Sequence, residues 1–316
     1  MTDKIRLGIS SCLLGNPVRY NGQHKLDRFL ADQLGQYVEW VPVCPEVECG
    51  LPVPRETMRL VGAPEAPRLV TTHSGVDHTE KMLNWIQRKL AELEKENLCG
   101  FVFKSRSPSS GMQGVKIYTE QGMPSRQGSG LFAGAFMHRF PLIPVEDDGR
   151  MNDAGLRENF IERIFVMHRW KQFLEAGGGA AGLVDFHTRH KLLIMAHSPK
   201  DLKPLGNLVA RGRRADRNRL HNEYLECLMS ALKLKATVRK NTNVLDHIMG
   251  YFKKQLDPDE KKELKEVIAE YHQELVPLIV PVVLLRHYVR KFDEPYLKQQ
   301  VYLHPHPGEL KLRNHA

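Results

Sequence analysis

The chain has 316 residues, of which 41% are hydrophobic and 26% charged, a composition that excludes a disordered protein and allows two folded domains. Its longest apolar run, from Leu275 to Leu285, contains two prolines and is shorter than the ~20 residues of a membrane-spanning helix. A net charge of +9, five cysteines and no recognisable secretory leader favour a cytoplasmic protein with reduced thiols and a polyanionic partner.

The first half of the chain alternates short β-rich runs with amphipathic segments. Strands are predicted at 5–9, 38–43, 68–72, 100–104, 115–118 and 142–145. Helices are expected at 26–35 and at 77–97, and in the second of these the apolar residues repeat at the spacing of one helical face. This alternation predicts an α/β fold, with a mostly parallel sheet that is covered by helices.

After about residue 152 the strand signals nearly vanish. Helices are predicted at 156–174, 180–195, 216–234 and 241–256. A further helix is expected to begin at Asp257, where Asp-Pro-Asp-Glu supplies an N-cap, a proline at the first helical position and a glutamate at the third. We therefore expect an α/β domain at 1–150 and a mostly helical domain at 151–316.

The positive charge is concentrated in the helical half. Between Phe186 and Lys254 the chain has 15 Lys and Arg against 5 Asp and Glu, which leaves 31 against 32 in the remainder. The segment RGRRADRNR alone contributes five arginines, namely Arg211, Arg213, Arg214, Arg217 and Arg219. A solvated helical face is one explanation of such a run. The arginine fork suits phosphate recognition, so the alternative that we favour is an RNA-binding surface.

Reactive side chains follow three of the predicted strands. Cys12 follows IRLGISS, Cys44 follows VEWVPV, and Ser105 follows GFVFK. In a parallel sheet the carboxyl ends of the strands open onto one crevice, where such folds bind ligands. Glu46 and Cys49 come close behind Cys44 and are expected at the same edge. This convergence predicts a metal or iron–sulfur site with catalytic groups beside it.

The cysteine pattern favours a cluster over a structural zinc site. Cys44 and Cys49 are near enough in sequence to bind one metal from a loop. Zinc would need a fourth Cys or His, and none is nearby in sequence, so His24 or His73 would have to approach through folding. Three cysteines without an evident fourth ligand suggest instead a cluster with one iron not ligated by protein, which can act as a Lewis acid.

Other groups near these cysteines are candidates for proton transfer and charge stabilisation. Glu46 lies two residues after Cys44 and suits a general acid or base, the alternative being a surface carboxylate paired with Arg55 or Arg19. The turn KSRSPSSGM, which begins with Lys104 and Ser105, offers hydroxyl and backbone donors to an anion, although many serine-rich turns are plain loops.

Three segments together resemble the thiouracil desulfidase (TudS) family: SSCLLGNPVRYNG at 10–22, VCPEVECGLPVPRE at 43–56 and FKSRSPSSG at 103–111. The helical remainder resembles the YbgA-type domain, and the two-domain layout is similar to that of the tRNA 4-thiouridine desulfidases (RudS). The resemblance implies a [4Fe–4S] cluster held by three cysteines, whose fourth iron takes the sulfur of a thiocarbonyl. It also implies that the second domain engages tRNA containing 4-thiouridine.

The same resemblance implies a ligand set for the cluster. Cys12 and Cys44 match two of the family's ligands. Single-domain relatives often have a cysteine where this chain has Ser110, and commonly have glycine where it has Cys49. Cys49 is therefore the predicted third ligand. Cys99 is only the second choice. It precedes its strand, so it is expected at the opposite edge of the sheet, in a structural role.

The implied activity is a redox-neutral hydrolysis that converts 4-thiouridine in tRNA to uridine and hydrosulfide. Glu46 matches the family's acid/base glutamate, and Ser105, helped by Lys104, is the predicted serine, with Ser107 as the alternative. Three other functions are compatible with the sequence. They are a desulfidase of free thiouracil or thionucleosides, a non-enzymatic nucleic-acid-binding protein with a structural metal, and a thiol redox enzyme.

Overall fold

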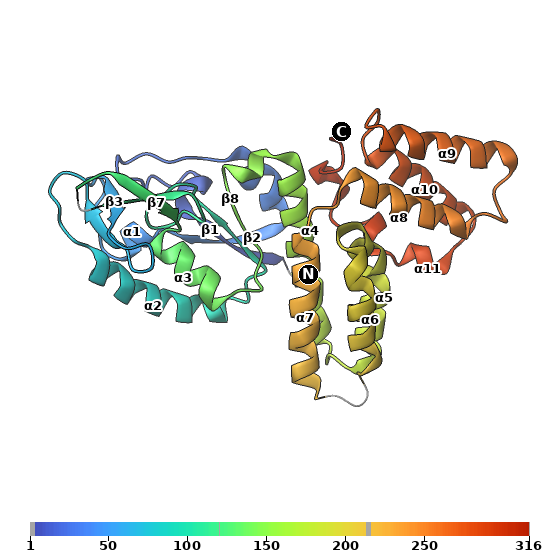
Figure 1. Ribbon diagram of the computed structural model, residues 1–316, viewed down its shortest axis with the longest axis horizontal. Helices are drawn as coiled ribbons and strands as arrows, with labels where there is room; N and C mark the ends of the chain where they lie inside the picture. The colour runs from blue at the N-terminus through green and yellow to red at the C-terminus, as the bar shows by residue number, and fades with distance from the viewer. Residues whose placement is uncertain (1–3, 120, 213–215, 316) are drawn as a thin grey trace. The chain divides into compact units, whose positions relative to one another are not determined.

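A computed structural model describes residues 4–119, 121–212 and 216–315, and Figure 1 shows its course. The chain divides into two compact units, Met1–Asp153 and Ala154–Ala316. The first unit combines two β-sheets with helices, and the second unit is helical, which confirms the predicted fold class (Figure 1).

The first sheet is parallel and carries the strand ends that matter for function. Its strands are β1 (Ile5–Ser10), β2 (Val38–Val43), β5 (Gly100–Phe103) and β8 (Val145–Asp147), in the order β2-β1-β5-β8. Each neighbouring pair is parallel, so all four strands end at one edge. β5 is buried throughout, as expected of a strand covered on both faces. β8 begins only after Pro144, whose missing N–H cannot donate to the ladder, so the prediction of a strand at 142–145 was early.

The second sheet holds two strands that the sequence patterns missed. Its order is β4-β3-β6-β7, from β3 (Met58–Val61), β4 (Arg68–Thr71), β6 (Val115–Tyr118) and β7 (Pro124–Gly128). β3 and β6 are parallel, while the two outer pairs are antiparallel. β7 begins with a proline and ends with a glycine, which are turn residues, so pairing with β6 rather than propensity makes it a strand.

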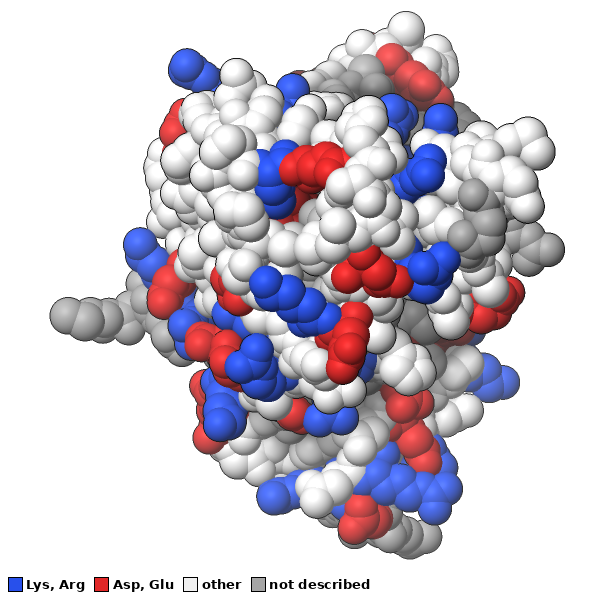
Figure 2. All heavy atoms as spheres, turned by 90° about the vertical axis from the view of Figure 1, so that its left-hand side faces the viewer, with Lys and Arg blue, Asp and Glu red and all other residues white. Residues whose placement is uncertain are grey.

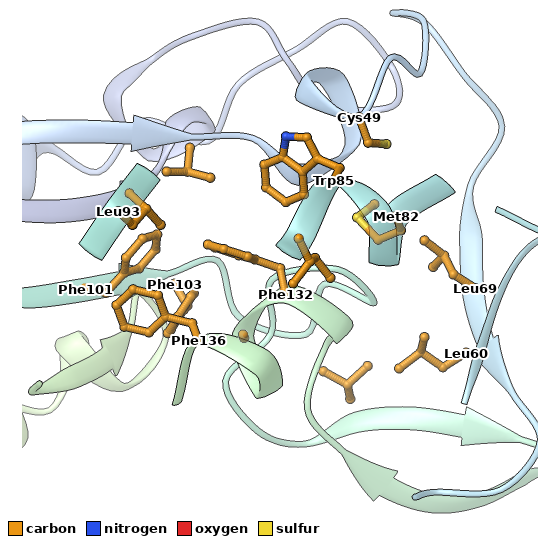
Figure 3. Packing of buried hydrophobic residues seen from close by; sticks show 14 of the residues in the cluster. Cys49, Leu60, Leu69, Met82, Trp85, Leu93, Phe101, Phe103, Phe132 and Phe136 are labelled. Carbon is orange, nitrogen blue, oxygen red and sulfur yellow. The ribbon is translucent and has the colours of Figure 1, made fainter. Parts of the chain in front are cut away.

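The core of the first unit lies between the two sheets, α2 (Thr79–Lys95) and α3 (Leu131–Arg139). Phe101 and Phe103 of β5 stack at 4.3 Å between ring centroids, and Phe132 and Phe136 of α3 close around them (Figure 3). Gly8 of β1 is opposite Phe101 in the ladder, and the aromatic ring occupies the space that a Cβ atom would need. This rigid layer fixes the ends of β1 and β5 relative to each other.

Short helical turns connect the strands of the first unit. The helix predicted at 26–35 is instead a π-helical turn at Phe29–Gln33 followed by a 3-10 turn at Leu34–Gln36. The first of the connecting turns, η1 (Ser11–Leu14), comes directly after β1 and ends at Gly15, whose φ of 91° is in the region that favours glycine. α1 (Pro45–Glu48) comes directly after β2. Both turns thus leave the same edge of the parallel sheet.

The second unit contains eight α-helices in the described part of the chain: α4 (Ala154–Glu175), α5 (Ala180–His197), α6 (Leu202–Ala210), α7 (Arg217–Lys233), α8 (Val238–Tyr251), α9 (Pro258–His272), α10 (Ile279–Lys291) and α11 (Pro295–Lys298). The predicted cap of α9 is confirmed, because Asp257 and Glu260 form a reciprocal capping box. α6 and α10 were missed because each contains a proline near its start, where a helix tolerates it. Among the residues that the structure describes, no helix has the length and apolarity to cross a membrane.

Two features hold the second unit together. Trp170 of α4 stacks on Tyr224 of α7 with 5.4 Å between ring centroids and meets Phe186 of α5 edge to face. Elsewhere in this unit, charged side chains are buried: Glu162 of α4 and Arg313 form an ion pair at 2.9 Å, and each side chain is only 4% exposed. Buried ion pairs of this kind are costly to break, because either partner alone would be an uncompensated charge.

Candidate active site

Reactive side chains converge at the carboxyl ends of the four parallel strands. Cys12 lies in η1 after β1, and Cys44 is the N-cap of α1 after β2. Lys104 and Ser105 follow β5, and Asp148 follows β8. The backbone N–H of Lys104 donates to Ser10 Oγ at 2.8 Å and so ties the end of β5 to the end of β1. The strand ends place these groups at one edge, as expected for a parallel sheet.

A cavity of about 390 Å³ opens between these strand ends. Five of the residues predicted from the sequence contribute to its lining, namely Cys12, Cys44, Glu46, Lys104 and Ser105. The serine-rich turn supplies Ser107, Ser109 and Ser110 to the same wall. The site is therefore concave and combines thiols, a carboxylate, hydroxyls and an ammonium group.

The two thiols of the cavity are mutually close and hard to ionise. Burial, and next the nearby Cys44 sulfur, raise the pKa of Cys12 to about 11. Burial likewise raises the pKa of Cys44, although backbone hydrogen bonds oppose it. Thiols in this state are protonated at neutral pH and are poor nucleophiles on their own. A bound metal would convert them to thiolates by displacing their protons.

Glu46 is held in a fixed orientation by three donors. Arg55 Nε donates to Glu46 Oε2 at 2.8 Å, and the Arg55 Nη2 atom pairs with the same oxygen. Ser109 Oγ donates to Oε1 at 2.8 Å. The ion pair with Arg55 was the alternative explanation of Glu46, and the structure contains it within the cavity wall rather than on an open surface. The Glu46 side chain is 15% exposed, so it is oriented yet still reachable by a ligand.

Lys104, Ser105 and Asp148 form a second polar group at the carboxyl ends of β5 and β8. Lys104 Nζ donates to Asp148 Oδ2 at 2.8 Å and to Ser105 Oγ at 2.9 Å, while the Ser105 backbone N–H donates to Asp148 Oδ1 at 2.6 Å. Burial opposes ionisation of Asp148, but the hydrogen bonds from Lys104 and Ser105 hold its pKa below the ordinary value. The carboxylate therefore fixes both neighbours and neutralises the lysine charge.

Cys49 and Cys99 lie away from the cavity lining. The Cys49 side chain belongs to the hydrophobic cluster that includes Met82 and Trp85, as Figure 3 shows, and its Sγ lies 3.2 Å from the carbonyl oxygen of Glu46. Burial raises the pKa of its thiol. Cys99 is only 2% exposed and directly precedes β5, at the end of the strand remote from Ser105. By contrast, Ser110 is part of the cavity wall.

The arginines predicted to bind RNA are partly committed to partners within the second unit. Arg211 and Arg219 both pair with Glu223, at 2.9 and 2.8 Å. Arg217 donates to the carbonyl oxygen of Gly177 at 3.1 Å. Arg213 and Arg214 lie outside the described residues. Two of the positive charges in this segment thus share one acidic partner.

Sequence reasoning missed two residues that organise the site. Asp148 was overlooked because β8 was predicted too early, yet its position directly after a strand is the same signal that identified Cys12 and Ser105. Ser109 was treated as part of a serine-rich turn, and only the fold brings it to Glu46, which is far away in sequence.

Two protein-family models match this chain. A model described as 2-thiouracil desulfurase matches residues 7–148, and one described as a protein of unknown function (DUF1722) matches residues 191–307. The uncharacterized protein YbgA of Escherichia coli (strain K12) is 30% identical over 165 residues, which cover 52% of this chain and 98% of YbgA. The uncharacterized protein YbbK of Bacillus subtilis (strain 168) is 32% identical over 108 residues, which cover 33% of this chain and 71% of YbbK. A solved structure titled [4Fe-4S]-dependent thiouracil desulfidase TudS has 31% sequence identity and a TM-score of 0.39, and the match covers 48% of this chain and 95% of that one.

Proposed function

This chain belongs to the 2-thiouracil desulfurase family through its first half and to the YbgA family through its second, and from this premise we propose that it is a desulfidase acting on 4-thiouridine in tRNA. The observation that carries the proposal is the cavity at the strand ends. Within the residues matched by the desulfurase model, two thiols, an oriented carboxylate and a lysine–serine pair line one cavity. A thiocarbonyl hydrolase needs a sulfur acceptor, a proton carrier and a positioned water, and these groups are of the types required.

We propose that the cavity holds a [4Fe–4S] cluster with one iron not ligated by protein. The thiols of Cys12 and Cys44 fit this group, because both line one cavity, lie close to each other and are the ligand type that such clusters take. Cys49 is the proposed third ligand, which requires its side chain to turn from the hydrophobic cluster toward the cavity. When bound, the cluster would supply a Lewis acid that polarises the thiocarbonyl group of the base.

Glu46 is the proposed proton carrier. Arg55 and Ser109 hold its two carboxylate oxygens on the cavity wall. From there Glu46 takes a proton from the attacking water or exchanges one with N3 of the base. General acid–base catalysis requires the carboxylate to be positioned for proton transfer. Glu46 is already fixed by hydrogen bonds and does not need to reorganise when the proton moves.

Ser105 is the proposed positioning group for the water. Asp148 holds the Ser105 backbone, and Lys104 donates to the Ser105 hydroxyl oxygen at 2.9 Å, so the position of the oxygen is fixed. The ion pair with Asp148 balances the charge of Lys104 and fixes the position of its ammonium group. The Lys104 ammonium and the Ser105 hydroxyl together stabilise the negative charge that develops on the reacting centre.

The overall reaction balances without an external oxidant or reductant. A C4–O bond forms from water, and the C4–S bond breaks with both electrons on sulfur. One water proton ends on sulfur to give hydrosulfide, and the other passes through Glu46 to solvent. The products are uridine and hydrosulfide, and no electron enters or leaves.

The proposal is tested with protein reconstituted anaerobically with iron and sulfide. The holo-protein is mixed with 4-thiouridine-containing tRNA, and loss of the near-ultraviolet thiocarbonyl absorbance is followed together with sulfide release. We expect both signals to change in parallel and iron and sulfide each to approach four per chain, about the content of one cluster. A persistent thiocarbonyl band with no sulfide, in protein that contains the cluster, would refute the assignment.

Free thiouracil is the second candidate substrate, because the matched family model is described as a 2-thiouracil desulfurase. The same preparation separates the two possibilities. Turnover of free thiouracil with none of thiolated tRNA would assign the chain to the smaller substrate, and stoichiometric zinc without iron would favour a nucleic-acid-binding protein instead.

A further inference from the structure

A second hollow adjoins the candidate active site within the first unit. It has a volume of about 900 Å³ and lies between β3, β6 and the turns after β5 and β8. The two hollows share part of their walls, in particular Lys104, Ser105 and Arg106. A ligand that fills the second hollow therefore contacts residues that also line the active-site cavity. We call this second hollow the basic groove.

The basic groove is strongly positive. Among its described lining residues five are basic and one, Asp147, is acidic; the basic ones are Arg59, Lys104, Arg106, Lys116 and Arg150. Two of these are already paired, Lys104 with Asp148 at 2.8 Å and Arg150 with Glu146 at 2.6 Å. Figure 2 shows a face of the molecule on which basic and acidic side chains are interspersed. In the lining of the basic groove, basic residues outnumber acidic ones by five to one, and three of the five are in neither of these two ion pairs.

The three remaining cations are Arg106, Lys116 and the half-buried Arg59. Arg106 and Lys116 are exposed, and no carboxylate of the described residues forms an ion pair with either of them. Arg106 has a φ of 58°, a left-handed backbone conformation that is costly for a residue other than glycine. The Nε atom of Arg59 is buried and has no hydrogen-bond partner in the described part of the structure. A buried donor without a partner is one that a bound anion would satisfy.

An aromatic ring lies among these cations. Tyr118, at the end of β6, lines the basic groove, and the guanidinium of Arg59 lies 5.5 Å from its ring centroid. Val61 pairs with Tyr118 across the parallel β3–β6 ladder, so the sheet fixes the position of the tyrosine backbone. Positive charge along a groove together with an aromatic ring is the arrangement by which single-stranded nucleic acids are bound, through phosphates and base stacking.

We propose that the basic groove binds the phosphate backbone of the RNA next to the thiolated nucleotide. The first unit itself then contributes to binding of the polynucleotide. This inference rests on the proposed function, because it assumes that the base entering the neighbouring cavity belongs to an RNA. It differs from the expectation that the arginines at 211–219 are the RNA-binding surface, since Arg211 and Arg219 share Glu223 as a partner. In the basic groove, by contrast, the cations border the cavity where the chemistry occurs.

Lys116→Glu is the most informative variant. Lys116 lies on the exposed side of β6, lines the basic groove and does not line the active-site cavity. Arg88→Glu is the matched control, because Arg88 is an exposed arginine of α2 that lines neither hollow. Arg59→Gln with Lys116→Glu is the second variant, and thermal unfolding establishes that each protein is folded. Affinity for unmodified tRNA is measured on the holo-protein by fluorescence anisotropy at several salt concentrations.

We expect Lys116→Glu to weaken tRNA binding about fivefold or more and to lower the slope of log affinity against log salt by about one, as for a lost phosphate contact. Arg88→Glu should bind like the wild type. Wild-type affinity and slope in both groove variants would overturn the proposal. Because unmodified tRNA is the ligand, this outcome is independent of desulfidase activity, so failure of the proposed function would be recognised separately by the absence of turnover.

A comparison of substrates decides whether the phosphate in the basic groove belongs to a polynucleotide or to a single nucleotide. The turnover of thiolated tRNA is compared with those of 4-thiouridine 5′-monophosphate and free 4-thiouracil in the wild type and in Lys116→Glu. We expect the ratio of tRNA to free-base turnover to fall in the variant, while the ratio of monophosphate to free base changes less. An equal fall for the monophosphate would mean that one nucleotide phosphate occupies the basic groove, and would overturn the inference that it follows a polynucleotide.

Discussion

Two glutamates one helical turn apart in α4 are expected to respond very differently to removal of their charge. Arg313 Nη2 lies 2.9 Å from Glu162 Oε1, and Arg313 Nε lies 3.0 Å from Glu158 Oε1. Only Glu162 has a second buried partner, since His197 Nε2 lies 2.9 Å from its other oxygen. The perturbation is therefore the isosteric pair Glu162→Gln and Glu158→Gln, each made in the full chain.

The magnitude follows from the pKa values of the two carboxyl groups. Burial alone would raise both, but His197 and Arg313 lower the pKa of Glu162 from 4.5 to about 2. Burial and the charge of Glu162 raise the pKa of Glu158 to about 7. At about 1.4 kcal/mol per pH unit, the depression at Glu162 corresponds to about 3 kcal/mol of unfolding free energy at pH 7. Glu162→Gln should lose about this amount, whereas Glu158→Gln should lose less than about 1 kcal/mol, because Arg313 keeps Glu162.

The pH dependence has opposite signs at the two positions. The stabilisation from Glu162 is complete above pH 4.5 and is lost as the pH falls toward 2, because the folded-state pKa is depressed. Glu158 binds a proton more tightly in the folded state, so its contribution is present below pH 4.5 and is lost as the pH rises through about 7. Glu158→Gln should therefore flatten the stability profile between pH 4.5 and 7.

Amide hydrogen exchange of α4 and α5 measures the relevant stability, because it reports the opening free energy of the second unit within the intact chain. Glu162→Gln is expected to speed exchange of both helices at pH 7, and Glu158→Gln to leave it nearly unchanged. If Glu158→Gln accelerated exchange at pH 7 as much as Glu162→Gln, the unequal division of charge between the two carboxylates would be refuted.

Three further outcomes are expected for the candidate active site. Cys12→Ala should reduce iron bound after reconstitution to background, and wild-type iron content would remove Cys12 from the ligand set. Cys49→Ala should lower the iron content per chain. If the Cys49→Ala protein bound iron fully and the Ser110→Ala protein did not, the third ligand would be the Ser110 hydroxyl. Glu46→Gln should lower kcat on thiolated tRNA about a hundredfold with unchanged iron content, and wild-type kcat would exclude proton transfer by Glu46.

The sequence predicted the layout of the first unit well where strands are buried on both faces. β1 and β5 lie close to their predicted ranges, because nearly continuous apolar runs bounded by polar residues identify central parallel strands. β2 stands at the edge of the sheet and has the exposed Glu39, and its predicted range is correct because its valines and Trp40 favour a strand. β3 and β7 lie in the second sheet, at positions where Arg59, Pro124 and Gly128 weaken the local pattern. Such strands depend on their partners for stability, and a pattern within one segment does not contain that information.

The position of the candidate site was predictable for a simple reason. Residues that directly follow parallel strands meet at one edge whatever the details of packing, and this rule placed Cys12, Cys44 and Ser105 together. The contact between Ser109 and Glu46 obeys no such rule, because it depends on how a loop after β5 folds back over α1. Asp148 follows the rule but was concealed by the misplaced start of its strand.

Cys49 shows why spacing along the chain predicts reach but not direction. Cys44 is the N-cap of α1 and Cys49 is its C-cap, so the two residues flank a short helix. At about 100° per residue, five residues along a helix turn a side chain by about 140°, away from the side that Cys44 faces. The cavity wall accordingly contains Cys44 and Glu46, while Cys49 joins Met82 and Trp85 in the hydrophobic cluster. Ser110, which comes from the turn after β5, lines the same cavity as Cys12 and Cys44. Use of Cys49 as a ligand therefore requires its side chain to turn toward the cavity, and we expect the C-terminus of α1 to unwind as it does so. Faster hydrogen exchange at Glu48 and Cys49 in the holo-protein than in the apo-protein would reveal that change, and equal or slower exchange would exclude it.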